Sequence, residues 1–403
     1  MDTTIRKTFA ALEVRNFRLF IFGQGISMCG TWMQTIGVSW LVLKITHSGT
    51  QLGLVVAAQF LPMLVFGVFG GVVADRFNKR HILYLTQTLA ALLALTLGLL
   101  VLTHSIHLWM IYSLAIGLGL VNVVDNPTRQ SFVVEMVGKD YLKNAVTLNS
   151  TMVNVARVVG PSIAGVIIAT LGIGQCFIVN ALSYIAVLFA LYLMHEAELH
   201  RAPISPREPG QIRAGLAYAW SEPTIKSTLI MMFIVGTFAY EFPVILPLFA
   251  TITLHGDAAT YSALMGATGL GAVIGGLYTA GRAATRETQL IWAAILLGLS
   301  ILAASITPDL ITALIVLVVE GGLSVLFIAL GNTTLQLTSD PSMRGRVMSL
   351  WSIAFLGTTP IGGPIIGFIS DHSNPRIGLA VGGVSGIVAG LFGYYIYKRT
   401  QTL

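Results

Sequence analysis

The chain has 403 residues, of which 55% are hydrophobic and only 10% are charged. Soluble proteins carry about 25% charged residues, so this composition excludes a water-soluble globule. The formal net charge of +6 at pH 7 would suit a nucleic-acid partner, but the positions of the basic residues exclude that class as well.

Apolar runs of 18 or more residues recur along the chain, and each is long enough to cross a bilayer as a helix. The first follows a basic amphipathic start without a small-residue cleavage site, so we expect a retained span rather than a signal peptide. The sequence predicts an all-α membrane protein with twelve transmembrane helices at 17–43, 50–74, 81–103, 108–133, 144–171, 173–194, 224–250, 258–280, 288–307, 309–335, 347–370 and 375–397.

Most of the 23 Lys and Arg residues lie in alternate connections between these spans. If both termini are cytoplasmic, only Lys44 and Arg376 fall in outer connections, and Arg157 lies within a span. The positive-inside rule therefore predicts cytoplasmic termini. Cys29 and Cys176 fall within predicted spans, so we expect neither a disulfide framework nor a metal site.

The longest polar connection, residues 195–223, separates two predicted six-helix bundles, 1–194 and 224–403. The sequence ADR at 74–76 corresponds to AGR at 280–282, and GPSIAG at 160–165 corresponds to GPIIGF at 363–368. Two related bundles are typical of transporters that bind substrate between the halves near mid-membrane. Gene duplication retained only for stability is the alternative.

A glycine–acid–base pattern that ends in a basic pair lies between the second and third predicted spans. It consists of Gly71, Asp75, Arg76, Lys79 and Arg80. The pattern resembles the signature loop of the major facilitator superfamily, and the resemblance covers the whole chain. It implies that these residues form a conformational latch; a stop-transfer charge cluster is the alternative. Asn78 stands where the pattern usually has a second glycine, and because Asn tolerates positive φ we expect the tight turn to survive.

The segment VARVVGPSIAG at 155–165 resembles the span-five signature of antiporters in this superfamily, carried by Gly160, Pro161 and Gly165. Glycine lets a neighbouring backbone approach, and proline bends the helix. The segments VDNPTRQSFV and SMRGRVMSL resemble bacterial enterobactin exporters and macrolide efflux proteins. This resemblance implies export of siderophores or amphipathic drug-like molecules, coupled to proton antiport.

Polar residues recur at helical spacing within several spans and should face a cavity or another helix rather than lipid. We expect them to line the substrate cavity, with hydrogen bonding between helices as the alternative. They are Gln24, Ser27, Thr31 and Gln34 in span one, Asn122 in span four and Asn154 in span five.

Four ionisable residues lie deep enough within spans to require a partner, water or a function. Arg157 is close to mid-membrane, and Asp125 is its first candidate partner. Glu320 lies beside Gly321-Gly322, which would suit a flexible helix, and Glu241 lies near two prolines in span seven. Asp125, Glu241 and Glu320 are all candidate proton carriers, and the sequence does not choose among them.

The sequence thus predicts a secondary active transporter of the bacterial cytoplasmic (inner) membrane. We expect a proton-coupled antiporter that exports its substrate by alternating access, acts as a monomer and has no cofactor besides the proton gradient. Its partners would be a small-molecule substrate, protons and the lipid bilayer. The alternatives are a symport importer, a lipid translocator and a non-transporting membrane sensor or scaffold. Scattered histidines and the lack of a phosphate-binding G-x-x-x-x-G-K-[ST] loop disfavour an enzyme or an ATP-driven pump.

Overall fold

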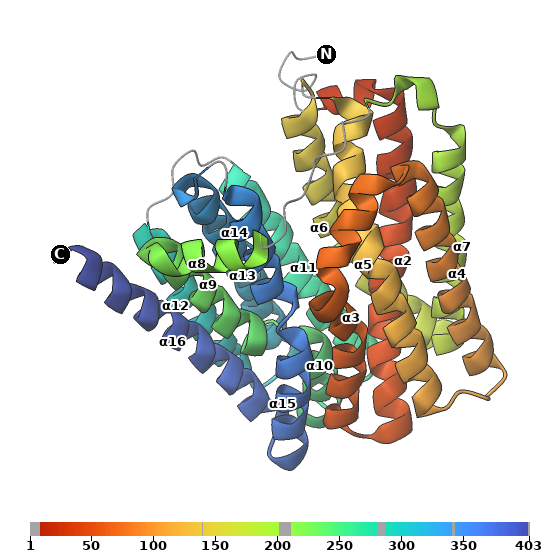
Figure 1. Ribbon diagram of the computed structural model, residues 1–403. Helices are drawn as coiled ribbons and strands as arrows, with labels where there is room; N and C mark the ends of the chain where they lie inside the picture. The colour runs from red at the N-terminus through yellow and green to blue at the C-terminus, as the bar shows by residue number, and fades with distance from the viewer. Residues whose placement is uncertain (1–8, 139, 201–210, 281–286, 341–342, 402–403) are drawn as a thin grey trace. The chain divides into compact units, whose positions relative to one another are not determined.

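The computed structural model describes residues 9–138, 140–200, 211–280, 287–340 and 343–401, and no strand occurs in these ranges. For a few helical residues, Asp75 among them, the side chain lies outside the described part. Figure 1 shows long helices joined mostly by short connections. The predicted all-α class is confirmed.

Twelve segments of the described residues are long and apolar enough to cross a membrane, which confirms the predicted number. Ten of these spans each lie in one helix. These helices are α2 (Arg15–Thr46), α3 (Gly49–Arg76), α4 (Lys79–Leu102), α5 (Leu108–Val137), α6 (Leu142–Thr170), α7 (Ile173–Leu193), α11 (Ala258–Ala280), α12 (Glu287–Ser305), α13 (Leu310–Thr338) and α16 (Pro375–Gln401). Short elements outside the spans are η1 (Ala10–Glu13), η2 (Glu196–Glu198) and α8 (Gln211–Ser221).

The seventh and eleventh spans are broken, although the sequence predicts each as one helix. The seventh consists of α9 (Pro223–Phe238), α10 (Phe242–Leu248) and a π-helical turn, η3 (Phe249–Thr253). The eleventh consists of α14 (Arg344–Leu356) and α15 (Thr359–His372). A proline lies in the first turn of both α10 and α15, a position where its missing N–H costs nothing. Transporters commonly build their binding sites at such discontinuous helices.

Contacts divide the chain into two compact units. The first contains Met1–Leu41 and Leu61–Pro206, and the second contains Val42–Phe60 and Arg207–Leu403. The predicted first bundle, 1–194, includes residues 42–60, which pack with the second unit instead. By sequence, the end of α2 and the start of α3 belong to the first repeat, but they pack in the second unit.

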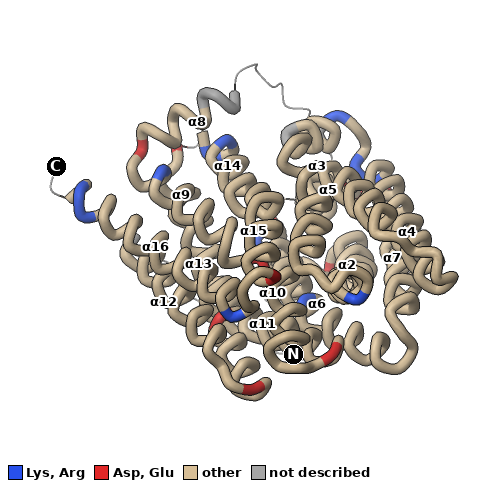
Figure 2. The backbone as a smooth tube through the Cα atoms, turned by 90° about the horizontal axis from the view of Figure 1, so that it is seen from below, with Lys and Arg blue, Asp and Glu red and all other residues tan. Residues whose placement is uncertain are grey.

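The first unit has a core of aromatic and aliphatic side chains, in which Phe20 meets the edge of Phe132 with ring centroids 6.0 Å apart. The outside of this unit is also apolar: Phe22 is 65% exposed and Val166 is 64% exposed. Charged residues are few along the tube in Figure 2. Apolar side chains on the outside match a lipid environment rather than water.

Candidate transport site

The signature loop joins α3 to α4, and its asparagine begins α4. Asn78 has φ −62° and accepts hydrogen bonds from the backbone N–H groups of Arg80 (3.0 Å) and His81 (3.4 Å). It is thus an ordinary N-cap residue, which satisfies two of the donors left unpaired at a helix start. The turn is made without positive φ at Asn78, because extended backbone is the conformation that capping requires.

The basic pair of the loop binds neighbouring elements of the first unit. Lys79 Nζ lies 2.6 Å from Glu135 Oε1 in α5, and both side chains are about nine-tenths buried. Arg80 donates to the carbonyls of Leu191 (2.9 Å) and Tyr192 (3.2 Å), where a cation stabilises the partial negative charge at the end of α7. Among the other loop residues, Gly71 and Arg76 lie in the last turns of α3, and the side chain of Asp75 is outside the described part.

Asp125 is buried in α5 with 4% exposure and is fully partnered. Its Oδ1 accepts hydrogen bonds from Thr86 Oγ1 and Gln87 Nε2 of α4, each at 2.7 Å. Arg129, one turn along α5, lies 3.5 Å from Oδ2. The structure therefore gives Asp125 a different ionic partner from the predicted Arg157, because the i, i+4 neighbour on the same helix is within reach.

Arg157 lies on α6 facing α2, where its guanidinium sits 5.0 Å from the centre of the Trp32 ring. A cation over an indole face is stabilised by the ring's quadrupole. One turn later, a side chain at Gly160 would collide with the backbone carbonyl of Cys29, so glycine is required for α6 to lie this close to α2. Pro161 and Gly165 are buried in the same stretch of α6.

The polar residues that the sequence predicts to line the cavity are of two kinds, buried and half-buried. Gln24 and Ser27 are 3% and 1% exposed, and Gln34 accepts a 2.6 Å hydrogen bond from Asn180 of α7. For Gln34 the structure thus shows the alternative, a bond between helices. The half-buried members of the stripes are Thr31, Asn122 and Asn154.

Glu241 lies in the second unit, at the break between α9 and α10, and is 2% exposed. Its carboxyl packs against α15, where a Cβ atom at Gly362 or Gly363 would lie 2.9 or 3.4 Å from its oxygens. The Thr359 side chain is close enough to interact, but neither oxygen has a hydrogen bond of ordinary geometry in the described part of the chain. Ionising a carboxyl in such a site is costly, which distinguishes Glu241 from Asp125, whose carboxyl accepts two hydrogen bonds.

Glu320 is fully buried in α13, which runs without interruption from Leu310 to Thr338. A side chain at the adjacent Gly321 would collide with the carbonyl of Thr268 in α11. Gly321 and Gly322 therefore allow two helices to pack closely, and the flexibility of this segment stays a prediction.

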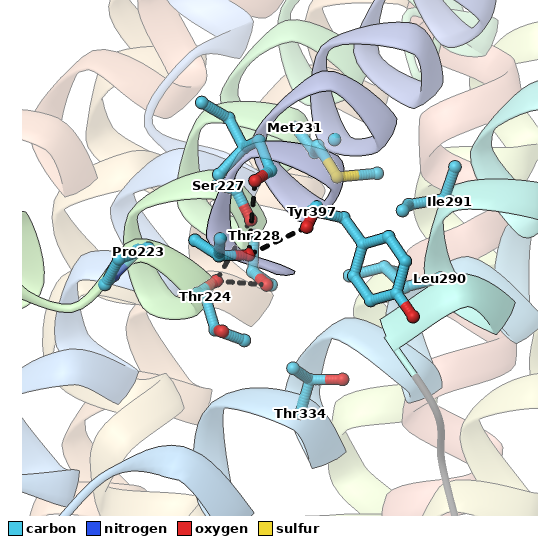
Figure 3. Close-up of a pocket in the computed structure, with 12 residues that line it drawn as sticks. Pro223, Thr224, Ser227, Thr228, Met231, Leu290, Ile291, Thr334 and Tyr397 are labelled. Atoms are coloured by element: carbon cyan, nitrogen blue, oxygen red, sulfur yellow. Dashed lines mark hydrogen bonds between the residues drawn. The ribbon is translucent and has the colours of Figure 1, made fainter. Parts of the chain in front are cut away.

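A small hollow lies between α9, α12, α13 and α16 (Figure 3). Ser227 and Thr228 both donate to the backbone carbonyl of Thr224, at 3.2 and 2.8 Å. None of the predicted cavity or coupling residues lines this hollow, so it is not a candidate for the substrate path.

The family model for transmembrane secretion effectors of the major facilitator superfamily matches residues 6–401. The chain belongs to this family. It is a multi-pass protein of the bacterial inner membrane, and it is a transporter by family. The predicted superfamily is confirmed.

Several curated relatives are named as exporters or pumps. The chain is 25% identical over 379 residues to the enterobactin exporter EntS of Citrobacter koseri, covering 93% of this chain and 90% of that protein. It is 24% identical over 364 residues to the multidrug efflux pump Tap of Mycolicibacterium fortuitum, covering 88% of each chain. A shorter match, 33% over 180 residues, joins it to the staphyloferrin A transporter of Staphylococcus aureus and covers 44% of this chain and 45% of that one.

A solved structure shares the fold across nearly the whole chain. A POT family transporter in complex with 5-aminolevulinic acid superimposes with a TM-score of 0.77 at 12% identity, covering 95% of this chain and 96% of that one. At this identity the likeness concerns the fold alone.

Proposed function

We propose that this chain is a proton-coupled antiporter that exports a siderophore or an amphipathic drug-like molecule by alternating access. The observation that carries the proposal is the likeness, over about nine-tenths of the chain, to an enterobactin exporter and a multidrug efflux pump. The buried carboxyl of Glu241, packed where two broken spans meet, supplies a group suited to carry the proton.

The substrate would be recognised by the half-buried polar residues of the first unit. Thr31, Asn122 and Asn154 keep exposed surface within apolar spans, and hydrogen-bonding groups in such places mark a substrate pathway. Arg157 and Trp32 together present a cation and an aromatic face. This combination suits an acidic, aromatic molecule such as a catecholate siderophore.

The signature loop would act as the latch of the cycle. Asp75 and Arg76 are the last two residues of α3, at the end that the positive-inside rule places on the cytoplasmic face. We expect Asp75→Asn to slow turnover by about tenfold, within the range produced by coupling energies of about 1–3 kcal/mol. Substrate affinity should stay unchanged, because the loop lies outside the cavity residues. Transport rate and equilibrium binding, measured on the same purified protein, check both expectations; unchanged turnover would leave the loop as a topology signal.

The test of the function uses proteoliposomes that contain a pH-sensitive dye and receive siderophores, macrolides or cationic dyes from outside. An antiporter moves protons out as substrate enters, so the lumen becomes more alkaline with either orientation of the protein. A symporter would acidify the lumen, and a uniporter would move substrate without a change in pH. Alkalinisation by one compound supports the proposal, and either of the other two results contradicts it.

A further inference from the structure

The N-terminus of α3 is capped by a side chain from a helix more than 300 residues away. Asp371, near the end of α15, accepts hydrogen bonds from Ser48 Oγ (2.7 Å), the Gly49 N–H (2.5 Å) and both the N–H (2.8 Å) and Oγ1 (2.7 Å) of Thr50. Helix starts leave N–H groups unpaired and carry partial positive charge, and a residue of the same chain segment usually caps them. At α3 the local cap is present, since Ser48 Oγ accepts from the Gln51 N–H at 3.2 Å, and the carboxylate of another helix adds a second one.

Beneath this cap the two helices touch along their glycines. A Cβ atom at Gly53 of α3 would collide with the carbonyl of Gly363, and one at Gly367 of α15 would collide with the carbonyl of Gly49. Gly49 and Gly53 are four residues apart in α3, and Gly363 and Gly367 are four residues apart in α15. Each helix therefore presents a small-xxx-small face to the other. The contact therefore combines close backbone packing with a charged cap at the solvent-exposed end, since Asp371 itself is exposed.

This contact joins a segment of the first sequence repeat to a helix of the second. By sequence, Gly49 and Gly53 belong to the first repeat, whereas α15 belongs to the second; by packing, residues 42–60 belong with α15 in the second unit. The remainder of α3 packs in the first unit, and Pro62 lies just past the change. Because proline removes a helical hydrogen bond, α3 is weakest where it passes from one unit to the other.

We propose that Asp371 is a gating residue, and that it forms with the facing glycines a releasable clamp on the face opposite the chain termini. We call this contact the outer clamp, because the positive-inside rule makes that face the outer one. It consists of Ser48, Gly49, Thr50 and Gly53 of the first repeat and Gly363, Gly367 and Asp371 of α15.

The inference rests on the proposed alternating access, in which the two repeats must separate at each face in turn. The polar groups of the clamp reach water, which replaces their hydrogen bonds on opening, so release is readily reversible. Removing the cap should therefore shift the resting population toward a state open at the outer face.

The experiment measures the labelling rate of a cysteine buried beside the clamp with a membrane-impermeant maleimide applied from outside. In a chain with Cys29 and Cys176 replaced by serine, Leu52→Cys places a thiol at a fully buried site three residues into α3. We expect Asp371→Ala to accelerate labelling at this thiol by at least about tenfold, within the range typical of conformational coupling. Asp371→Asn should give a smaller acceleration, because the amide keeps one acceptor oxygen but loses the charge.

A matched control exists on the same face. Asp309 caps α13 in the usual local way, by accepting from the Thr312 N–H at 3.0 Å, and the fully buried Ala313 lies three residues into that helix. Asp309→Ala should not accelerate labelling at Leu52→Cys, and Asp371→Ala should not accelerate labelling at Ala313→Cys.

Selective acceleration at Leu52→Cys by the Asp371 variants would support the clamp. Equal acceleration at both thiols would show general loosening, and no acceleration in a folded variant would show that the cap does not control opening; either result overturns the inference. If Asp371→Ala does not fold, Asp371→Asn decides. The labelling does not depend on protons, so a failure of proton coupling leaves this result standing, and a failure of the clamp leaves the transport assay standing.

Discussion

Glu241→Gln is expected to abolish substrate-driven proton movement, reducing it to the rate of protein-free liposomes, while the protein folds and binds substrate. Glutamine matches the shape of the protonated carboxyl but cannot release a proton. At this position the change is tolerable for packing, because the side chain lies against the backbone of Gly362 and Gly363. The neutral form is the one that this buried site favours, so the variant should be held in the protonated-like state of the cycle.

The measurement for Glu241→Gln is the dye assay described above, combined with substrate binding to the purified variant. Glu222→Gln is the matched control, because Glu222 precedes the same span but is exposed. The control should transport as the unaltered chain does. Proton movement at the normal rate in Glu241→Gln would exclude Glu241 as the carrier and transfer the role to Asp125 or Glu320. The three substitutions Asp125→Asn, Glu241→Gln and Glu320→Gln are not expected to be equivalent.

Lys79→Ala is expected to lower the free energy of unfolding by about 3–5 kcal/mol, the cost of leaving a buried charge without its partner. Lys79 and Glu135 are the closest ion pair described in the first unit, at 2.6 Å, and both are largely shielded from solvent. The alanine variant leaves the Glu135 side chain without its cationic partner at a largely buried position. Denaturant titration of the purified protein in detergent measures the loss.

The double variant Lys79→Ala/Glu135→Gln separates the pair from the packing of the lysine side chain. Replacing the carboxylate by an amide removes the unpaired charge, so most of the lost stability should return. Lys44→Ala, at an exposed position, should change stability by less than about 0.5 kcal/mol. If the single and double variants are equally destabilised, the charge pair is not the source of the effect.

Hydropathy alone was sufficient for the class and the number of spans, because lipid forces every crossing segment to be an apolar helix that pairs its own backbone groups. The breaks at Glu241 and at Gly357–Thr358 were not predicted, although Pro243 and Pro360 lie beside them. Proline within an apolar run is also common in continuous helices, such as α5 with Pro127. Only tertiary contact decides between a break and a continuous helix.

The partners of the buried charges were the least predictable part of the site. Asp125 binds Thr86 and Gln87 because α4 packs against α5, a fact that spacing along one helix does not contain. Asp371 went unnoticed for the same reason: its donors at 48–50 lie in the other repeat. A Ser-Gly-Thr run at the start of a span is typical of a self-capped helix, and Ser48 does accept from the Gln51 N–H; only the packing against α15 shows that a second cap comes from Asp371.

The measurement that tests proton-coupled export most directly is substrate accumulation in proteoliposomes with a lumen one pH unit more acidic than the medium and the membrane potential clamped at zero. One pH unit corresponds to about 1.4 kcal/mol per proton, so exchange of one proton should concentrate a labelled siderophore or drug about tenfold inside. Dissipating the pH gradient should release the accumulated compound. A compound that equilibrates across the membrane but never rises above its outside concentration would contradict proton antiport.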